Sequence, residues 1–292
     1  MWCHIKSIRY GRSEEFIMGN TKVGLIPAGG KAKRISPLPC SKEIYPVGMQ
    51  AFQNAQGPRP KVAAHYLLEK MVQANVQRVF TIIRKGKWDI PAYFGDGKMV
   101  GVPIAYLIMD LPYGVPYTLD QAYPYAKDSV VFFGFPDIVF SPDDAFIILY
   151  KKLKERKADV VVGLFEADKP HKMDMVNLNS AGDIKDIEIK PSTTTLTYTW
   201  IIAVWSPNFT QFMHDYVEED SRKKAVVVEG DSPTIQSELY LGHVIRAAIH
   251  QDLKVSAVIF EHAEYIDIGT PNDILKLATK AYNLAGEYYD NS

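Results

Sequence analysis

Short apolar runs alternate with helix-length stretches along the first 165 residues, and this alternation most limits how the chain can fold. The runs have the length and the flanking turn residues of buried strands. They lie at residues 23–27, 78–83, 102–108, 129–135 and 159–165. Helices are expected at 60–74 and 117–125, and another begins at Ser141-Pro142, with Ser as the N-cap. Such a series predicts an α/β protein, with a mostly parallel sheet covered by helices on both faces.

Beyond residue 165 the predicted strands are shorter and follow one another more directly. They lie at 175–178, 184–189, 196–205, 254–260 and 265–268. Helices are expected at 208–217 and 235–250, and Thr270 is expected to cap a C-terminal helix. No repeat or Pro/Gly/Ser-rich linker divides the chain, so residues 18–292 are predicted to form one domain. Two long loops, 48–59 and 218–234, are expected to border the functional site.

The composition excludes several classes of protein. The 33 Lys and Arg residues against 34 Asp and Glu leave a net charge of −1, without the basic excess of nucleic-acid binders. No apolar run reaches the ~18–20 residues of a membrane span, so no membrane partner is expected. Two cysteines without paired spacing, Cys3 and Cys40, indicate a cytoplasmic location and no disulfide framework. Residues 1–17 lack apolar periodicity and are expected to be a dispensable extension.

A glycine pair, Gly29-Gly30, directly follows the first predicted strand, where open α/β sheets bind ligands. Two familiar phosphate loops do not fit: Leu25 and Ala32 break the Walker spacing, and no Gly-x-Gly-x-x-Gly is present. The segment 22–42 nevertheless has no acidic residue and five basic ones: Lys22, Lys31, Lys33, Arg34 and Lys42. This charge indicates a polyphosphate cradle, although an exposed basic loop would have the same composition.

Ordered motifs along most of residues 21–280 carry a family resemblance. They read AGGKAKRISP at 28–37, SKE at 41–43, RPK at 59–61, GFPD at 134–137, IKP at 189–191 and YIDIGTP at 265–271. Together they resemble the sugar-phosphate nucleotidylyltransferases, above all the glucose-1-phosphate thymidylyltransferase and uridylyltransferase group. The resemblance implies a Rossmann-like, mixed but mostly parallel sheet of the nucleotide-diphospho-sugar transferase type. It also implies a nucleotide-binding half at 18–140 and a sugar-phosphate-binding half at 141–292.

The same resemblance implies the substrates and their sites. A nucleoside triphosphate and a sugar 1-phosphate are the expected partners, and a homo-oligomer stays open. Arg34 and Lys42 are the expected catalytic cations on the phosphates. The expected nucleotide-binding residues are Ala28, Gly29, Gly30, Lys31, Lys33, Pro112 and Gly114. The expected sugar-phosphate-binding residues are Lys190, Glu188, Thr199 and Trp200.

Asp137 and Asp267 match the family's two aspartates for Mg²⁺, the expected cofactor. An aspartate near a strand end is more often a turn former or a helix cap. Here Ser141 and Thr270 already fill those caps, which leaves both aspartates free for a metal. Mg²⁺ prefers one or two carboxylates plus phosphate oxygens. Considered by itself, Lys190 is expected to be a solvated surface lysine. Only the family resemblance assigns it to the sugar phosphate.

The sequence departs from the family pattern in three places. Ala32 and Lys33 stand in a signature that usually reads Gly-x-Gly-Thr-Arg, and Leu111 replaces a glutamine that reads the base. Trp200 replaces a small residue near the sugar. Two functions therefore stay open: Mg²⁺-dependent nucleotidyl transfer, with dTTP or UTP and glucose 1-phosphate favoured, and non-catalytic binding of nucleotides or sugar phosphates. The paired aspartates favour the enzyme, since a pure binder has little use for a metal site.

Overall fold

The first strand among the described residues lies inside the sheet. In a computed structural model, which describes residues 21–50, 58–110, 113–179, 182–228, 238–277 and 279, β1 (Lys22–Ala28) pairs in parallel with β4 (Arg78–Arg84) and β6 (Val130–Gly134). β5 (Ile104–Met109) extends this parallel half beyond β4. The apolar runs are buried on both faces, as expected for central parallel strands. The segment 1–17, Leu111 and Pro112 lie outside the described residues.

An antiparallel strand joins the second half of the sheet to the first. β11 (Tyr198–Trp205) pairs along one edge with β8 (Val160–Glu166), and its other edge pairs with β9 (Asp174–Leu178) at the start of the strand and with β6 at its end. Two more strands, β10 (Ile184–Ile189) and β12 (Val255–Ile259), complete a sheet of nine strands within the described residues. The mixed sheet, parallel in its first half, confirms the predicted fold class.

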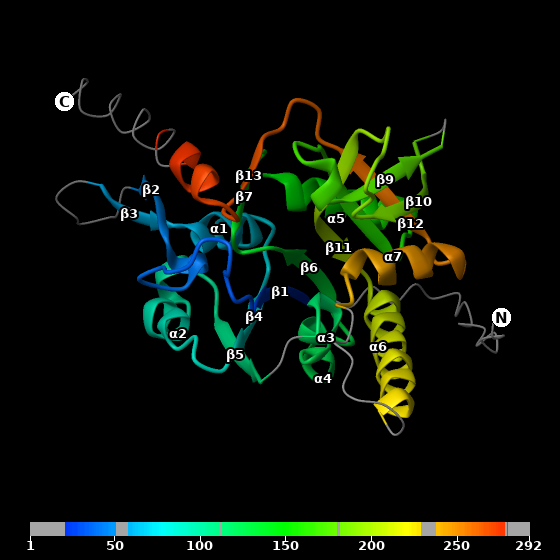
Figure 1. The fold of residues 1–292 in the computed structure, drawn as a ribbon, viewed down its shortest axis with the longest axis horizontal. Coiled ribbons are helices and arrows are strands. Elements are labelled where there is room, and N and C mark those ends of the chain that lie inside the picture. Colours follow the sequence, from blue (N-terminus) through cyan, green and yellow to red (C-terminus); the bar gives the residue numbers. More distant parts are fainter. Residues whose placement is uncertain are drawn as a thin grey trace.

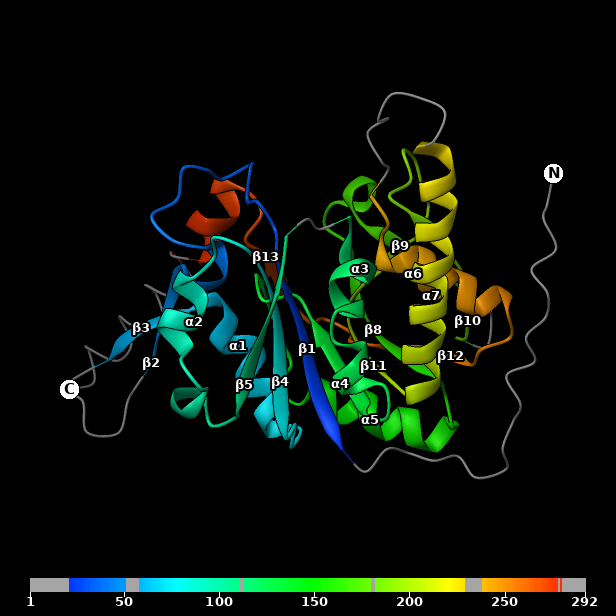
Figure 2. The same ribbon diagram turned by 90° about the horizontal axis from the view of Figure 1, so that it is seen from below.

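Helices cover both faces of this sheet (Figures 1 and 2). One apolar cluster packs against α1 (Ala63–Gln73), α2 (Asp89–Phe94) and α5 (Ala145–Arg156). The other packs against α3 (Val115–Asp120), α4 (Tyr123–Ala126), α6 (Pro207–Val228) and α7 (Leu241–His250). Three short 3-10 turns lie in the described loops: η1 (Lys42–Ile44), η2 (Lys98–Val100) and η3 (Pro170–Lys172).

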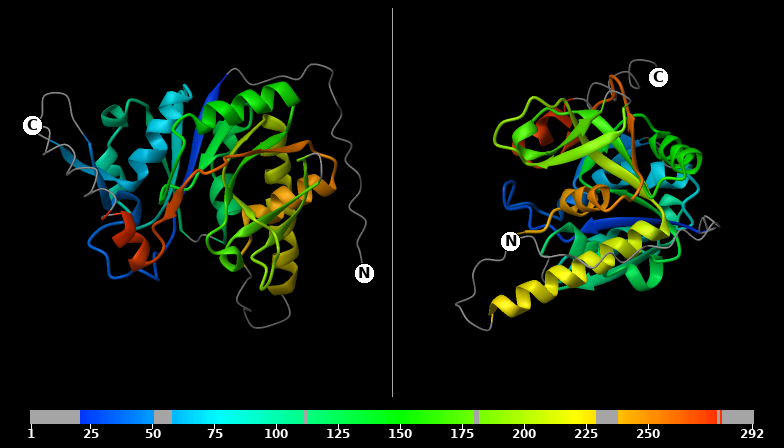
Figure 3. Two further views of the ribbon diagram at one scale, coloured as in Figure 1. Left: turned by 90° about the horizontal axis from the view of Figure 1, so that it is seen from above. Right: turned by 90° about the vertical axis from the view of Figure 1, so that its right-hand side faces the viewer.

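The C-terminal segment crosses back to the first half of the chain (Figure 3). β13 (Tyr265–Asp267) pairs with β7 (Ile138–Phe140), and residues 271–277 form a helix. A small core joins that helix to the start of α1 and to β2 (Pro46–Gln50), which forms a hairpin with β3 (Arg59–Val62). The described residues include no helix that is long and apolar enough to span a membrane.

The structure corrects two of the predicted loops and one helix start. Residues 60–62 were expected in a helix but are strand, because they pair with β2, and α1 begins only at Ala63. In the predicted loop at 48–59, residues 48–50 and 59 are strand residues of this hairpin, and 51–57 lie outside the described residues. The predicted loop at 218–234 is helical as far as Val228, since ion pairs between residues four apart support a polar helix there.

Other element boundaries differ by a few residues. The helix expected at Ser141 begins at Ala145, with Asp144 rather than Ser141 at the N-cap position. The helix expected at 117–125 is two short helices, and the one expected at 235–250 begins at Leu241, with 235–237 outside the described residues. Thr270 precedes the C-terminal helix as predicted, and its Oγ1 accepts the N–H of Asp273 at 3.4 Å.

Candidate active site

The glycine loop begins where β1 ends, at the carboxyl edge of the parallel strands. A side chain at Gly30 would lie 3.8 Å from Cε of Lys42, so this glycine brings the backbone close to that cation. One at Gly29 would lie 4.0 Å from Cβ of Arg84. Ala32 adopts φ 50°, the left-handed conformation that the usual glycine would adopt without strain. Lys31, Lys33 and Arg34 are exposed on this loop (residues 29–37).

A buried ion pair holds the base of the loop. Nζ of Lys87 lies 2.7 Å from each carboxylate oxygen of Glu43, and it donates to the carbonyl oxygen of Ala28 at 2.9 Å. Glu43 and Lys87 are only 2% and 7% exposed. Burial raises the pKa of the Glu43 carboxyl, and the Lys87 ammonium opposes that shift. The pair thus ties η1 and the loop after β4 to the last residue of β1.

Two aspartates, Asp137 and Asp267, lie near one another beside the loop. The ammonium of Lys42 forms an ion pair with Asp137, which is 8% exposed. The pKa of Asp267 is raised to about 6, chiefly by burial and to a smaller extent by repulsion from Asp137. The positive charges of Lys42 and Arg34 oppose this shift. A side chain at Gly269 would lie 3.0 Å from Oδ2 of Asp267 and 3.1 Å from Nη2 of Arg34. The structure therefore brings Arg34, Lys42, Asp137 and Asp267 together.

This donor set fits Mg²⁺. Two carboxylates repel one another in a buried position, and a divalent cation between them would remove that repulsion. The described part of the chain contains no cluster of three or more His, Cys, Asp or Glu that could enclose a metal. Such an incomplete set suits an ion that also takes ligands from substrate phosphates.

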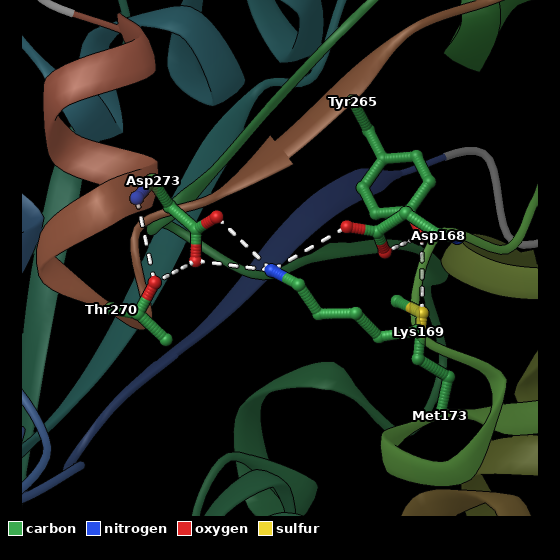
Figure 4. A network of polar contacts seen from close by, with 6 residues as sticks. All are labelled: Asp168, Lys169, Met173, Tyr265, Thr270 and Asp273. Atoms are coloured by element: carbon green, nitrogen blue, oxygen red, sulfur yellow. Dashed lines mark hydrogen bonds and ion pairs between the residues drawn. The ribbon is translucent and has the colours of Figure 1, made fainter.

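A cavity of about 380 Å³ opens next to Asp267. Its lining contains four cationic side chains, Arg34, Lys169, Lys172 and Lys190, together with His171 and three aspartates. Lys169 crosses one wall: its Nζ lies 3.0 and 3.2 Å from the carboxylate oxygens of Asp273 and 3.5 Å from Asp168 (Figure 4). Sequence reasoning missed Lys169 and Lys172, because their only signal was a lysine-rich turn.

Lys190 reaches this cavity at the end of β10. Its backbone has φ 43°, a left-handed conformation that is unfavourable for a residue with a side chain. The carboxylate of Asp174 accepts the backbone N–H groups of Lys190 and Gly242. Gly242 is needed there, because a Cβ at that position would lie 2.2 Å from Oδ2 of Asp174.

Other predicted residues lie away from the cavity. Glu188 accepts a hydrogen bond from Oγ1 of Thr194 at 2.9 Å, and Oγ1 of Thr199 donates to the carbonyl oxygen of Asp174 at 3.0 Å. Trp200 is 6% exposed and packs near Phe133 and Phe135. None of the three lines the cavity among the described residues, so their roles stay predictions. Gly114, predicted to bind the nucleotide, forms an isolated strand bridge with Leu239.

Arg84 is a further cation that sequence reasoning missed. It ends β4 beside Gly29, and its Nε is buried without a hydrogen-bond partner in the part of the chain that the structure describes. A buried N–H without an acceptor is costly, and ligands or water commonly satisfy such groups. Its position at the carboxyl end of a parallel strand is the only signal that could have singled it out.

We expect Asp174→Asn to stabilise the protein more at pH 7.5 than at pH 4.5. Burial raises the pKa of Asp174 to about 6, so ionisation above that pH destabilises the folded state. The stability of the unmodified protein should therefore fall between about pH 4 and 6, by up to ~3 kcal/mol for a two-unit shift. Asparagine cannot ionise and lacks this dependence. Thermal melts at both pH values check this, with the exposed Asp128→Asn as control; equal gains at both pH values contradict it.

The chain belongs to the nucleotidyl transferase family, whose model matches residues 23–283. A nucleotidyltransferase of low-salt glycan biosynthesis from Haloferax volcanii is 20% identical over 257 residues. A glucose-1-phosphate thymidylyltransferase from Streptomyces antibioticus is 23% identical over 256 residues. Each alignment covers 87% of this chain and 64% of the relative, so the chain spans less than two thirds of these curated relatives.

Solved structures show the same fold. A protein from Bacillus anthracis that was assigned as a glucose-1-phosphate thymidylyltransferase and crystallised with sucrose superposes with a TM-score of 0.71 at 18% identity. That superposition covers 89% of this chain and 95% of the other. A UDP-glucose pyrophosphorylase bound to UDP-glucose superposes with a TM-score of 0.71 at 14% identity, over 90% and 99% of the two chains.

Proposed function

We propose that this protein transfers a nucleoside monophosphate from a nucleoside triphosphate to a sugar 1-phosphate, releasing pyrophosphate, with Mg²⁺ as cofactor. The observation that carries the proposal is the meeting of Arg34 and Lys42 with Asp137 and Asp267 at the edge of a cationic cavity. Family membership and relatives named as nucleotidyltransferases support it. The favoured substrates are dTTP or UTP and glucose 1-phosphate, in line with the Streptomyces relative.

The proposed reaction needs no nucleophile from the protein. It requires that the two substrates be positioned and that the negative charge on their phosphates be neutralised. A phosphate oxygen of the sugar 1-phosphate attacks the α-phosphorus, and the bond from that phosphorus to the β-phosphate oxygen breaks. The electron pair leaves with pyrophosphate, and the attacking dianion needs no general base. Mg²⁺ held by Asp137 and Asp267 would supply positive charge at the reacting phosphate. Correct placement of the two substrates alone supplies about 7–11 kcal/mol toward the barrier.

The residues of the chain divide this work. Arg34 and Lys42 lie where negative charge develops on the triphosphate, and cations aimed at such charge stabilise a transition state. Lys190, which lines the cavity, is proposed to bind the phosphate of the sugar 1-phosphate. The exposed Lys31 and Lys33 extend the positive loop toward solvent, where they would meet the outer phosphates. Arg84, at the end of β4, has a buried Nε without a hydrogen-bond partner among the described residues and offers one more donor.

The test is the release of pyrophosphate from five nucleoside triphosphates with glucose 1-phosphate and Mg²⁺. We expect dTTP and UTP to be used within roughly tenfold of one another. Leu111 stands where the family has a glutamine, so the base would be recognised by backbone groups and by shape rather than by a side-chain amide. No pyrophosphate with any triphosphate would favour the alternative, a protein that binds nucleotides or sugar phosphates without catalysis. Strict use of a purine triphosphate would contradict the pyrimidine preference.

We expect Lys190→Ala to raise the KM for glucose 1-phosphate much more than the KM for the triphosphate. The lysine directly follows β10 and lines the cavity, and a charge-assisted bond to phosphate is among the stronger polar contacts. The loss should be about tenfold or more for one such contact. Lys185→Ala, at an exposed lysine on β10 itself, serves as the matched control. Equal changes in both KM values would place Lys190 outside the sugar-phosphate site.

A further inference from the structure

The ammonium of Lys190 rests on the ring of Tyr240. Its Nζ lies 3.4 Å from the ring centroid, well inside the ~6 Å within which a cation and an aromatic face attract each other. Tyr240 immediately precedes α7, far from Lys190 along the chain, so the contact exists only in the folded protein. Lys190 also lines the cavity. The contact with Tyr240 therefore fixes the position of the Lys190 ammonium before a ligand binds.

The ring of Tyr240 is itself held in place. It stacks on the imidazole of His243, with centroids 5.6 Å apart and planes at 17°. The backbone N–H of Tyr240 donates to Nδ1 of His243 at 3.2 Å, and burial lowers the pKa of His243, which favours the neutral imidazole that can accept this bond. The preceding residue, Leu239, donates its N–H to the carbonyl oxygen of Tyr113 at 3.1 Å.

The backbone of Lys190 is fixed independently. Asp174 accepts its N–H, and the left-handed φ of 43° is the kind of strained conformation that surrounding contacts must maintain. Both ends of the lysine are therefore constrained, the main chain by Asp174 and the ammonium by Tyr240. A free lysine side chain would lose much rotamer freedom when it binds an anion. Here part of that loss has already occurred.

We propose that Tyr240 is a positioning residue for Lys190, whose ring holds the ammonium toward the cavity in readiness for the phosphate of the sugar 1-phosphate. The inference rests on the proposed function and extends it to a residue outside the family motifs. The aromatic face alone performs this role, since the contact is between the cation and the ring. Preorganisation of this kind raises affinity by lowering the entropy lost on binding.

Steady-state kinetics test the proposal. In Tyr240→Leu we expect the KM for glucose 1-phosphate to rise roughly three- to thirtyfold, the range of one cation–π contact, with kcat and the triphosphate KM within about twofold. Tyr240→Phe keeps the ring and should restore the original KM. In a Lys190→Ala background, Tyr240→Leu should add nothing further. A similar KM in Tyr240→Leu and the unmodified protein overturns the proposal, even if the melting temperature falls.

Tyr150 provides a matched control. Its ring also carries a lysine, with Nζ of Lys22 at 4.4 Å, but it lies on α5 and does not line the cavity. Tyr150→Leu removes a comparable contact and should leave the KM for glucose 1-phosphate unchanged. A rise equal to that of Tyr240→Leu would show that any lost ring–lysine contact loosens the protein, and would overturn the specific role of Tyr240.

A spectroscopic arm separates this inference from the proposed function. When the lysines carry ¹³C-methyl groups, the Lys190 signal, identified by its loss in Lys190→Ala, should be shifted upfield by the Tyr240 ring. The shift should vanish in Tyr240→Leu and persist in Tyr240→Phe, and added glucose 1-phosphate should move the signal. If no pyrophosphate is released while these shifts occur, the proposed transfer fails and the positioning role stands. If the Lys190 signal is not shifted in the methylated protein that retains Tyr240, the positioning role of Tyr240 is overturned.

Discussion

Replacing either aspartate of the predicted metal pair with asparagine should lower kcat by about 10²–10⁴-fold. A bound Mg²⁺ contributes several kcal/mol of charge stabilisation to phosphoryl chemistry, and each ~1.4 kcal/mol corresponds to tenfold in rate. Asp267→Asn should leave the melting temperature at pH 7.5 unchanged or higher, because burial and repulsion from Asp137 raise the pKa of Asp267 to about 6. An ionised Asp267 therefore destabilises the metal-free folded state at that pH.

Kinetics at increasing Mg²⁺ and thermal melts of the same variants provide the measurement. Binding of Mn²⁺ alone, followed by electron paramagnetic resonance, reports the metal site without any turnover and should weaken in both variants. Asp168→Asn is the matched control, because Asp168 lines the same cavity but bonds Tyr265, with Oδ1 at 2.8 Å from the hydroxyl. Near-normal turnover of Asp137→Asn or Asp267→Asn at saturating Mg²⁺ would remove that aspartate from the metal site.

Lys87→Met should be the most destabilising of the substitutions considered for this protein. It leaves the Glu43 carboxylate, 2% exposed, without its ion-pair partner and the Ala28 carbonyl oxygen without its donor. Removing one partner of a buried pair typically costs about 3–5 kcal/mol. In the variant the pKa of Glu43 should rise further, so the destabilisation is fully present above that raised pKa and shrinks as pH falls toward the ordinary value for glutamate.

Urea unfolding of the variant at pH 5 and pH 8 measures both effects. The double variant Glu43→Leu with Lys87→Met removes the orphaned charge and should recover most of the loss, since apolar residues can replace a buried pair. Lys98→Met is the control, because its pair with Asp96 is exposed and should contribute nothing measurable. A loss as small as that of Lys98→Met would show that water reaches Glu43 in the folded protein.

The periodicity of the sequence predicted the sheet well and the polar helices poorly. The buried strands β1, β4, β6 and β8 are apolar runs that can be recognised in the sequence without knowing which strands they pair with. Residues 218–224 look like a polar loop, because ion pairs rather than an apolar face support that part of α6. Residues 60–62 precede a helical pattern closely enough to be merged with it, and only pairing with β2 makes them strand.

The motifs of the family led to Arg34, Lys42, Asp137 and Asp267, which the fold brings together. They could not lead to Glu43 with Lys87, or to Asp174 with Gly242, because such partners are chosen by tertiary contacts. Tyr240 shows the limit most clearly: its relation to Lys190 depends on where the start of α7 lies against the end of β10. Spacing along the chain contains no trace of that contact.

The pairing of β13 with β7 also sets the order in which the site can arise during synthesis. Lys42 and Asp137 leave the ribosome together with the parallel half of the sheet, whereas Asp267 belongs to a strand made long afterwards. Nascent chains fold largely from the N-terminus as they emerge. A chain that stops before residue 267 lacks the second carboxylate of the proposed metal pair. The proposed nucleotidyl transfer would therefore have to wait until the C-terminal segment has been made and has returned to the first half of the fold.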